Sequence, residues 1–269
     1  MPTQSAAALP CEDSPAAKPA ESSRIGLIVP SSNTTMETEL PELFRRQGEV
    51  TGHRYTFHSA RAAMKQVSRQ ELLAMVERAA ECATAVSDAD VDVIAYACLV
   101  AVMAQRPGAH KESEQVIADA ARDNGHPAVV VSSAGALVRT LTAIGASRVS
   151  IVTPYMAPLT QMVREYIEAE GIHVLDAVAL EVPDNLAVGR LDPANLPGIA
   201  RGLRRAGAEA IVLSACVQMP SLPAVQAVED EFGLPVITAA TATAYEVLTA
   251  LGHQPAIAGA GRLLAGALS

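Results

Sequence analysis

Two cysteines, Cys98 and Cys216, end the same kind of short sequence word, in which an apolar run is followed by Ala and then Cys. A cysteine within an apolar strand usually packs as a small hydrophobe, but a cysteine at a strand end reaches the edge where parallel sheets bind ligands. Two thiols facing one substrate divide the work between a nucleophilic thiolate and a protonated acid. The pair therefore predicts covalent or proton-transfer chemistry.

The other two cysteines do not share this pattern. Cys82 lies on one face of an expected helix with Leu72, Met75 and other apolar residues, which favours core packing, and Cys11 lies in a Pro-, Ala- and Ser-rich tail. The sequence has no CxxC pair and no Cys/His ligand spacing, so neither a zinc site nor a disulfide framework is expected.

A polar loop is the second candidate feature. The apolar residues 25–29 run into Pro30 and then into Ser-Ser-Asn-Thr-Thr. Asn33 in this loop suits a helix N-cap, and the same loop could bind a carboxylate through its N–H groups and the Asn33 amide.

Tyr155 follows Pro154 and is either a packed residue or a phenol donor. Asn185, in V-P-D-N-L, is either a turn residue or a ligand-binding amide.

The elements that position these residues alternate between short apolar runs and longer amphipathic segments. That alternation is typical of an α/β protein with parallel sheets. Strands are expected at 25–29, 54–59, 91–97, 128–132, 149–153, 174–179, 210–214 and 236–239. Helices are expected at 69–87, 111–124, 157–170, 196–206 and 223–232, three of them ending at a glycine.

The sequence also repeats itself. R-I-G-L-I-V-P resembles R-V-S-I-V-T-P, V-D-V-I-A-Y-A-C resembles E-A-I-V-L-S-A-C, and P-A-V-V-V-S-S-A resembles P-V-I-T-A-A-T-A, in the same order. Three matches in register predict two similar Rossmann-like α/β/α halves, related by a pseudo-twofold, with the active site in the cleft between them. The first half is expected at 23–137 and the second at 138–239, after a disordered tail at 1–22.

The amino-acid composition argues against several classes of protein. The chain has 269 residues, 50% of them hydrophobic and 18% charged, as expected of a globular protein. Its net charge of −9, its 3% aromatic content and its lack of Trp argue against nucleic-acid binding. The longest apolar run, residues 93–104, is too short to cross a membrane. The tail does not resemble a signal peptide, so a cytoplasmic protein is expected.

The paired cysteines are similar to those of the aspartate/glutamate racemase superfamily, and the motifs narrow the resemblance to the maleate cis-trans isomerase family. The motifs are V-P-S-S-N-T-T-M-E at 29–37, Y-A-C-L-V at 96–100, P-Y at 154–155, P-D-N-L-A at 183–187 and S-A-C-V-Q at 214–218. The likeness extends from about residue 24 to the C-terminus.

The resemblance implies a role for each motif position. Cys98 would be the nucleophile and Cys216 the proton donor and acceptor, while Asn33, Tyr155 and Asn185 would bind the two carboxylates. Backbone amides around Leu99, Val100, Val217 and Gln218 would complete the anion sites. The family also implies a homodimer. It further implies that residues 240–269 return to the first half and complete it.

The implied reaction takes maleate to fumarate. Thiolate addition to the double bond gives a succinyl thioether whose single bond can rotate, and elimination then gives the trans isomer. Because the reaction changes no oxidation state, it needs no nicotinamide, flavin or metal.

Two alternatives remain beside the isomerase. One is a two-cysteine racemase of the Asp/Glu/hydantoin type, which exchanges a proton at a carbon next to a carbonyl. The other is a non-catalytic dicarboxylate-binding protein with two lobes. An arylmalonate decarboxylase is less favoured, because in that family one of the two positions is not cysteine.

Overall fold

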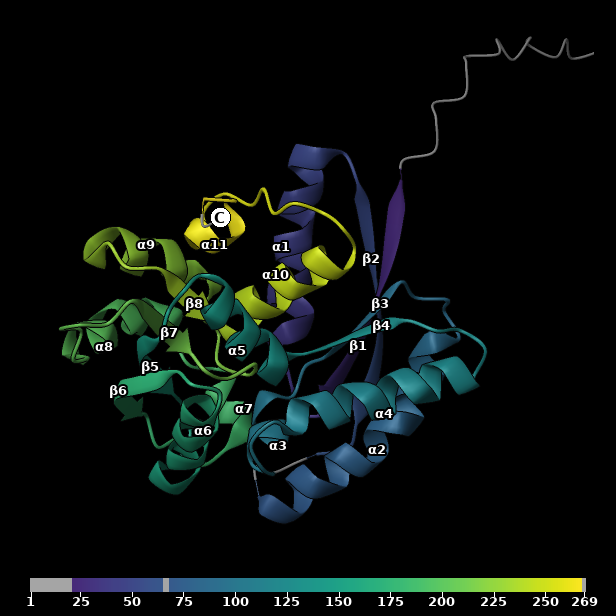
Figure 1. The fold of residues 1–269 in the computed structure, drawn as a ribbon, viewed down its shortest axis with the longest axis horizontal. Coiled ribbons are helices and arrows are strands. Elements are labelled where there is room, and N and C mark those ends of the chain that lie inside the picture. The colour runs from purple at the N-terminus through teal and green to yellow at the C-terminus, as the bar shows by residue number, and fades with distance from the viewer. Residues whose placement is uncertain (1–20, 65–67, 268–269) are drawn as a thin grey trace, which may run out of the picture.

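The chain forms two four-stranded parallel sheets that have the same strand order, β2-β1-β3-β4 and β6-β5-β7-β8 (Figure 1). The computed structural model describes residues 21–64 and 68–267. The predicted tail lies outside these residues except at its end, where Ser22 already begins β1. The α/β fold with two similar halves, predicted from the repeated words, is confirmed.

All eight predicted strands are present, with ends shifted by at most a few residues. The first sheet consists of β1 (Ser22–Pro30), β2 (Arg54–Ala62), β3 (Val93–Tyr96) and β4 (Val129–Ser132), and the second of β5 (Arg148–Thr153), β6 (His173–Ala179), β7 (Ala210–Ser214) and β8 (Val236–Thr238). The three repeated words fall on β1 and β5, β3 and β7, and β4 and β8. Each word therefore occupies the same place in its own sheet, which is why the matches occur in register.

The helices that the sequence predicted are also present. They are α2 (Arg69–Ser87), α4 (Ala109–Asp123), α6 (Ala157–Ala169), α8 (Leu196–Gly202) and α9 (Leu222–Phe232). The glycine stops act as expected, because Gly125, Gly171 and Gly233 have positive φ angles just beyond their helices. The helix predicted at 196–206 is shorter and ends at Gly202.

Further helices complete the halves: α1 (Met36–Thr51), α3 (Leu99–Met103), α5 (Ser133–Ala143), α7 (Asn185–Val188), α10 (Ala239–Ala250) and α11 (Gly261–Leu264), with a 3₁₀ turn at Pro193–Asn195. The sequence did not predict α5 and α10. Both are buried over most of their surface, so they lack the polar face that marks a surface helix.

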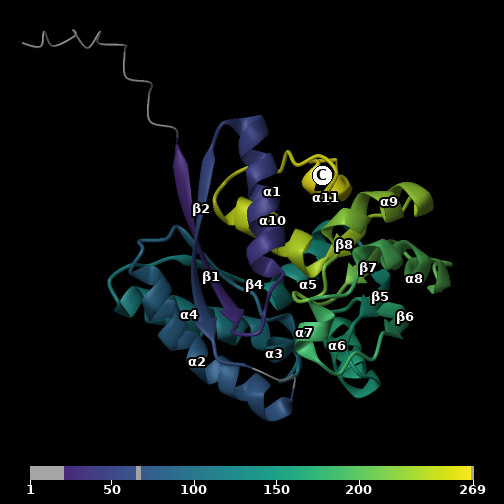
Figure 2. The same cartoon turned by 180° about the vertical axis from the view of Figure 1, so that it is seen from behind.

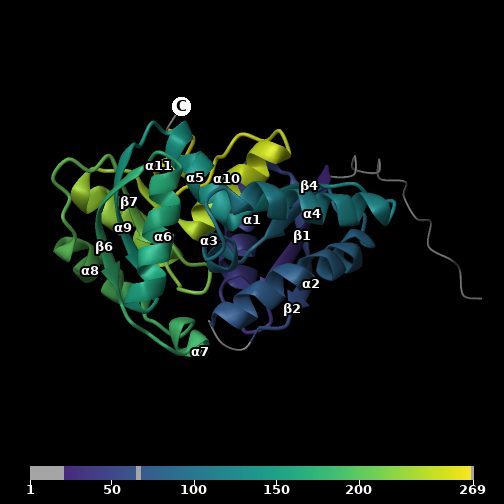
Figure 3. The same ribbon diagram turned by 60° about the horizontal axis from the view of Figure 1, so that its bottom comes forward.

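The two halves meet through these apolar helices. Helix α10 packs against α5 and α1 and also contacts β3, β4 and β8, so it lies between the sheets (Figures 1 and 2). Figure 3 separates the halves, with α2 and α4 beside the first sheet and α6, α8 and α9 beside the second. Within the described part of the chain, no helix combines the length and the hydrophobicity that crossing a membrane requires.

Candidate active site

Cys98 lies at the turn from β3 into α3, where it is the N-cap residue of that short helix. Its side chain is buried. Burial raises the pKa of the Cys98 thiol to about 12, although the backbone N–H of Ala101 donates to the sulfur and lowers it. The thiol is thus the dominant form at neutral pH, and a thiolate formed here is strongly nucleophilic because its pKa is high.

Cys216 occupies the matching place in the second half, on the loop that follows β7. This loop is folded back on itself, since the Ser214 hydroxyl donates to the Cys216 carbonyl at 2.9 Å and the Gln218 N–H donates to the Cys216 sulfur at 3.3 Å. Burial raises the pKa of the Cys216 thiol. Hydrogen bonds from the Tyr155 hydroxyl and from the N–H groups of Gln218 and Met219 lower it.

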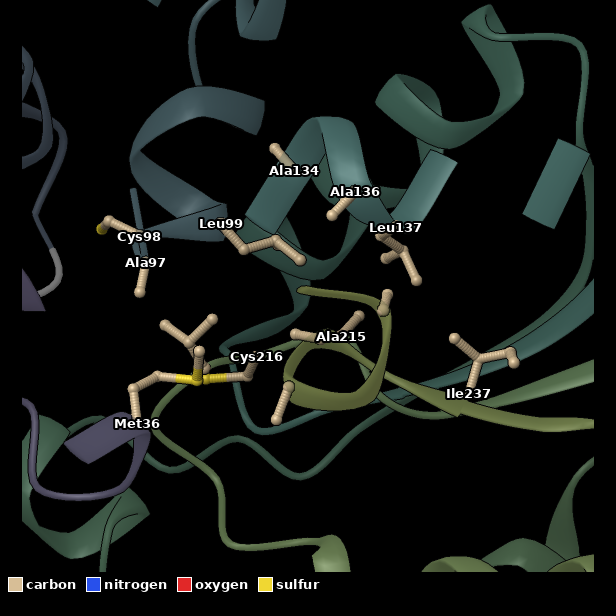
Figure 4. Packing of buried hydrophobic residues seen from close by; sticks show 14 of the residues in the cluster. Met36, Ala97, Cys98, Leu99, Ala134, Ala136, Leu137, Ala215, Cys216 and Ile237 are labelled. Atoms are coloured by element: carbon tan, nitrogen blue, oxygen red, sulfur yellow. The ribbon is translucent and has the colours of Figure 1, made fainter. Parts of the chain in front are cut away.

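The two thiols, one from each half, lie close to each other in the buried interior. Figure 4 shows them among buried apolar side chains that come from both halves, including Met36 and Leu99 from one half and Ala215 from the other. A negative charge on Cys216 raises the pKa of Cys98, so the thiols are close enough to interact electrostatically. This repulsion favours a state in which one thiol is ionised while the other keeps its proton.

Tyr155 lies two residues beyond the end of β5 and is only 5% exposed. Burial, with repulsion from Cys216, raises the pKa of its phenol well above the usual range. The hydroxyl therefore remains protonated and serves as a donor to the Cys216 sulfur. The structure places the Tyr155 hydroxyl at the Cys216 thiol. The sequence alone had left Tyr155 as either a packed residue or a hydrogen-bond donor.

Asn33 both caps a helix and joins the halves. Its Oδ1 accepts the N–H groups of Thr35 at 3.0 Å and Met36 at 2.9 Å, so it satisfies donors at the start of α1. Its Nδ2 donates to the carbonyl of Val217 at 3.1 Å, on the loop of Cys216. The N-cap residue of α1 is Thr35 rather than Asn33, but the Asn33 side chain still accepts two N–H groups at the start of the helix and lies against the Cys216 loop.

Asn185 and Gln218 hold three segments of the site together. Asn185, the first residue of α7, donates to the Ser32 hydroxyl at 2.7 Å. The Gln218 side chain donates to the carbonyls of Ser32 at 3.1 Å and Asn185 at 2.9 Å, and accepts the N–H of Thr34 at 2.9 Å. The polar loop, α7 and the Cys216 loop therefore form one hydrogen-bonded unit.

All nine residues predicted for the site are at most 6% exposed, and the carboxyl ends of the strands bring their segments together. Those from the first half are Asn33, Cys98, Leu99 and Val100, and those from the second are Tyr155, Asn185, Cys216, Val217 and Gln218. Cys82 lies outside this group, half-buried on α2, as the prediction of core packing requires. Cys11 lies outside the described residues.

Two residues at the site, Thr35 and Glu39, were not identified from the sequence, whereas Arg61 was considered there only as an exposed cation that could reach an anionic ligand. The Thr35 hydroxyl donates to the Gln218 carbonyl at 2.7 Å, and the Glu39 carboxylate accepts the N–H groups of Ser221 and Leu222 at the far end of the Cys216 loop. Arg61 pairs with Glu37 and donates to the carbonyls of Ser31 and Asn33, so it braces the polar loop. Their only sequence signal was their position near a helix start or strand end, which many structural residues share.

Comparison with known proteins places these features in a family. The family model described as arylmalonate decarboxylase matches residues 25–264. The maleate isomerase of Pseudomonas putida is 55% identical over 244 residues, which cover 91% of this chain and 98% of that protein.

Solved structures give the same relationship. The maleate isomerase Iso from Pseudomonas putida S16 is 49% identical, with a TM-score of 0.90 over 92% of this chain and all of that one. A cysteine-to-serine mutant of the maleate cis-trans isomerase of Nocardia farcinica is 48% identical, with a TM-score of 0.87 over 90% of this chain and 98% of that one. That mutant contains a covalently bound succinylcysteine intermediate.

Proposed function

This chain belongs to the maleate isomerases, within the family whose model carries the name arylmalonate decarboxylase, and we propose on that basis that it converts maleate to fumarate. It is a cofactor-independent cis-trans isomerase that acts through a covalent succinyl-cysteine intermediate. The observation that carries the proposal is the pair of buried cysteines at matching strand ends of two similar halves.

The first chemical step adds one thiol to the double bond. The Cys98 thiolate forms a bond to C2 of maleate, the π electrons move toward C3, and Cys216 gives its proton to C3. Negative charge develops on the carboxylate next to C3, so hydrogen-bond donors placed there lower the barrier. The product is a succinyl group on Cys98, in which the C2–C3 bond is single and can rotate.

The second step reverses the first after rotation. The Cys216 thiolate takes the proton back from C3, the C–H electrons re-form the double bond, and the C–S bond breaks to release the Cys98 thiolate. Fumarate leaves, and each thiol has returned to its starting state. No electrons are gained or lost overall. Cys98 supplies the nucleophile and Cys216 the proton in both steps.

The surroundings of each thiol support this division of roles. Cys216 receives hydrogen bonds from Tyr155 and from two backbone N–H groups, which stabilise the thiolate that remains after it donates its proton. Cys98 receives one such bond, from Ala101. A less stabilised thiolate is the better nucleophile, so Cys98 is assigned the addition and Cys216 the proton transfer.

The two carboxylates of maleate are assigned to the polar groups around the thiols. We place them against Asn33, Tyr155, Asn185 and the backbone amides at Leu99, Val100, Val217 and Gln218. The support is that Asn33, Asn185 and the Val217–Gln218 backbone come from three segments that hydrogen bonds join, so these groups are fixed in position. Fixed neutral donors in a buried site bind anions well.

The proposal is tested by incubating the protein with maleate, following fumarate by NMR and looking for a succinyl adduct by mass spectrometry. Wild type that forms no fumarate contradicts the isomerase. Cys98→Ala is expected to abolish both adduct and turnover, whereas Cys216→Ser is expected to retain an adduct at Cys98. An adduct found only at Cys216 would reverse the two roles. A racemase would instead incorporate deuterium at an α-carbon, and a binding protein would bind maleate without turnover.

We further propose a cytoplasmic homodimer, in line with the family resemblance. Chemistry that requires free thiols suits a reducing compartment, and Cys82, Cys98 and Cys216 are all unpaired. Light scattering coupled to size-exclusion chromatography tests the dimer. We also propose that residues 240–269 complete the first half; the packing of α10 against α5 and α1 supports this, whereas α11 packs against β8 and α9 of the second half.

A further inference from the structure

A buried carboxylate from the first half caps a helix of the second. Glu39, on α1, is 7% exposed, and its Oε1 accepts the N–H groups of Ser221 at 2.6 Å and Leu222 at 2.7 Å. Its Oε2 accepts the Ser221 hydroxyl at 3.4 Å. Ser221 is the N-cap residue of α9, but its own side chain makes no cap bond. The first free donors of α9 are therefore satisfied by Glu39.

The spacing on α1 gives Glu39 a partner. Thr35 precedes it by four residues, so the two side chains lie on the same face at the start of the helix. The Thr35 hydroxyl donates to the Gln218 carbonyl at 2.7 Å, while Glu39 holds Ser221 and Leu222. The first turn of α1 thus holds the loop that begins at Cys216 in two places: at Gln218, near the middle of the loop, and at Ser221 and Leu222, at its far end.

We propose that Glu39 is a positioning residue for Cys216, acting from the other half of the molecule through the backbone of residues 216–222. This inference rests on the proposed role of Cys216 as proton donor and acceptor. Proton transfer requires heavy atoms within about 3 Å of each other. A displacement of about 1 Å can cost about 100-fold in rate, so the loop that carries Cys216 must be held firmly.

A carboxylate suits this position better than an ordinary cap. One side chain meets two backbone N–H groups and one hydroxyl, which is more than a single Ser or Thr oxygen usually accepts. Its charge also acts on the thiol. Burial raises the pKa of Glu39, its bonds to Leu222 and Ser221 lower it, and its charge raises the pKa of Cys216. That charge helps to keep Cys216 protonated before the addition.

The test compares three variants in turnover and thermal stability. Glu39→Ala is expected to lower kcat by about 100-fold with a much smaller change in KM, because the proton donor is displaced. Glu39→Gln should restore most of kcat, because its Oε1 can still accept the two N–H groups. Glu229→Ala is the matched control: Glu229 is equally buried and accepts the N–H groups of Val236 at 2.9 Å and Arg262 at 2.6 Å, away from the Cys216 loop.

Two outcomes would overturn the inference. One is a kcat for Glu39→Ala no lower than that of Glu229→Ala at a similar loss of stability, and the other is a failure of Glu39→Gln to restore kcat. If Glu39→Ala does not fold, Glu39→Asp takes its place, since the shorter side chain withdraws the acceptor and should lower kcat in the same way.

A second readout separates this inference from the proposed function. The rates at which iodoacetamide alkylates Cys216 and Cys98 can be mapped by mass spectrometry without any turnover. Glu39→Ala should change the ratio of the two rates and Glu229→Ala should leave it unchanged. If wild type forms no fumarate but the ratio changes, the isomerase fails and Glu39 still positions Cys216. An unchanged ratio contradicts the role of Glu39 whatever the reaction.

Discussion

The amide of Asn33 donates to the carbonyl of Val217 at 3.1 Å, although the two residues lie in different halves and 184 positions apart in the sequence. The same side chain caps α1 through its oxygen. Helix α1 in turn presents Thr35 and Glu39 to the loop of Cys216. One asparagine therefore connects the start of a helix in one half to a thiol-bearing loop in the other.

Replacement of Asn33 by Ala should affect both stability and binding. The loss of the cap and of the bond to Val217 is expected to lower the free energy of unfolding by about 1–3 kcal/mol. We expect KM for maleate to rise about tenfold, since an anion donor is also lost. Asp192→Ala, which removes the cap of a remote 3₁₀ turn, is the control. Unchanged kinetics in Asn33→Ala would leave Asn33 as a cap only.

A glycine at the end of α7 makes room for the Gln218 side chain. A Cβ at Gly189 would lie 2.5 Å from the Thr34 hydroxyl and 2.6 Å from Gln218 Nε2, so Gly189→Ala must displace both of them. We expect kcat/KM for maleate to fall about tenfold or more, because three segments of the site lose their common anchor.

The same substitution at Gly198 is the control for Gly189→Ala. Gly198 lies in α8, and a Cβ there meets no atom within 4 Å. Gly198→Ala should stabilise the protein by up to about 1 kcal/mol through helix propensity and leave the kinetics unchanged. Equal kinetics in the two variants would show that the Gln218 anchor does not matter for turnover.

The pH dependence of turnover follows from the buried thiol. Burial raises the pKa of Cys98 to about 12, so the reactive thiolate is a minor form at neutral pH and its fraction grows as pH rises. We expect kcat/KM to increase about tenfold per pH unit between about pH 6 and about pH 9, measured from initial rates of fumarate formation. Cys82→Ala should give the same profile. A plateau beginning near neutral pH would show that the thiolate forms at a much lower pKa.

Tyr96, on β3, is fully buried, and its hydroxyl has no hydrogen-bond partner among the described residues. Tyr96→Phe removes an unsatisfied polar atom, so it should raise the free energy of unfolding by roughly 1 kcal/mol, measured by denaturant unfolding. Tyr166→Phe is the matched control, because its buried hydroxyl accepts the His110 N–H at 3.1 Å and bonds to the ring Nδ1 at 2.7 Å. That variant should be destabilised. A loss of stability in Tyr96→Phe would refute the assignment.

The sequence by itself determined the two similar halves and the matching positions of Cys98 and Cys216. The short sequences that form strands are local signals. Comparing the chain with itself is enough to find that three of them recur in the same order. Because a strand end in a parallel sheet is also the ligand-binding edge, the position of Cys98 and Cys216 within their words predicted where they would lie. The predicted strands and helix stops at Gly125, Gly171 and Gly233 agree with the structure for the same local reason.

Only the tertiary structure decided how the site is held together. The bonds from Asn33 to Val217, from Gln218 to Asn185 and from Glu39 to Ser221 join segments that no local pattern relates. Helices α5 and α10 escaped prediction because both sit between the halves and are apolar on nearly all sides. Hydrophobic periodicity identifies a helix that has one face toward the core and the other toward solvent. A helix buried between two halves has no solvent face, so it lacks this periodicity.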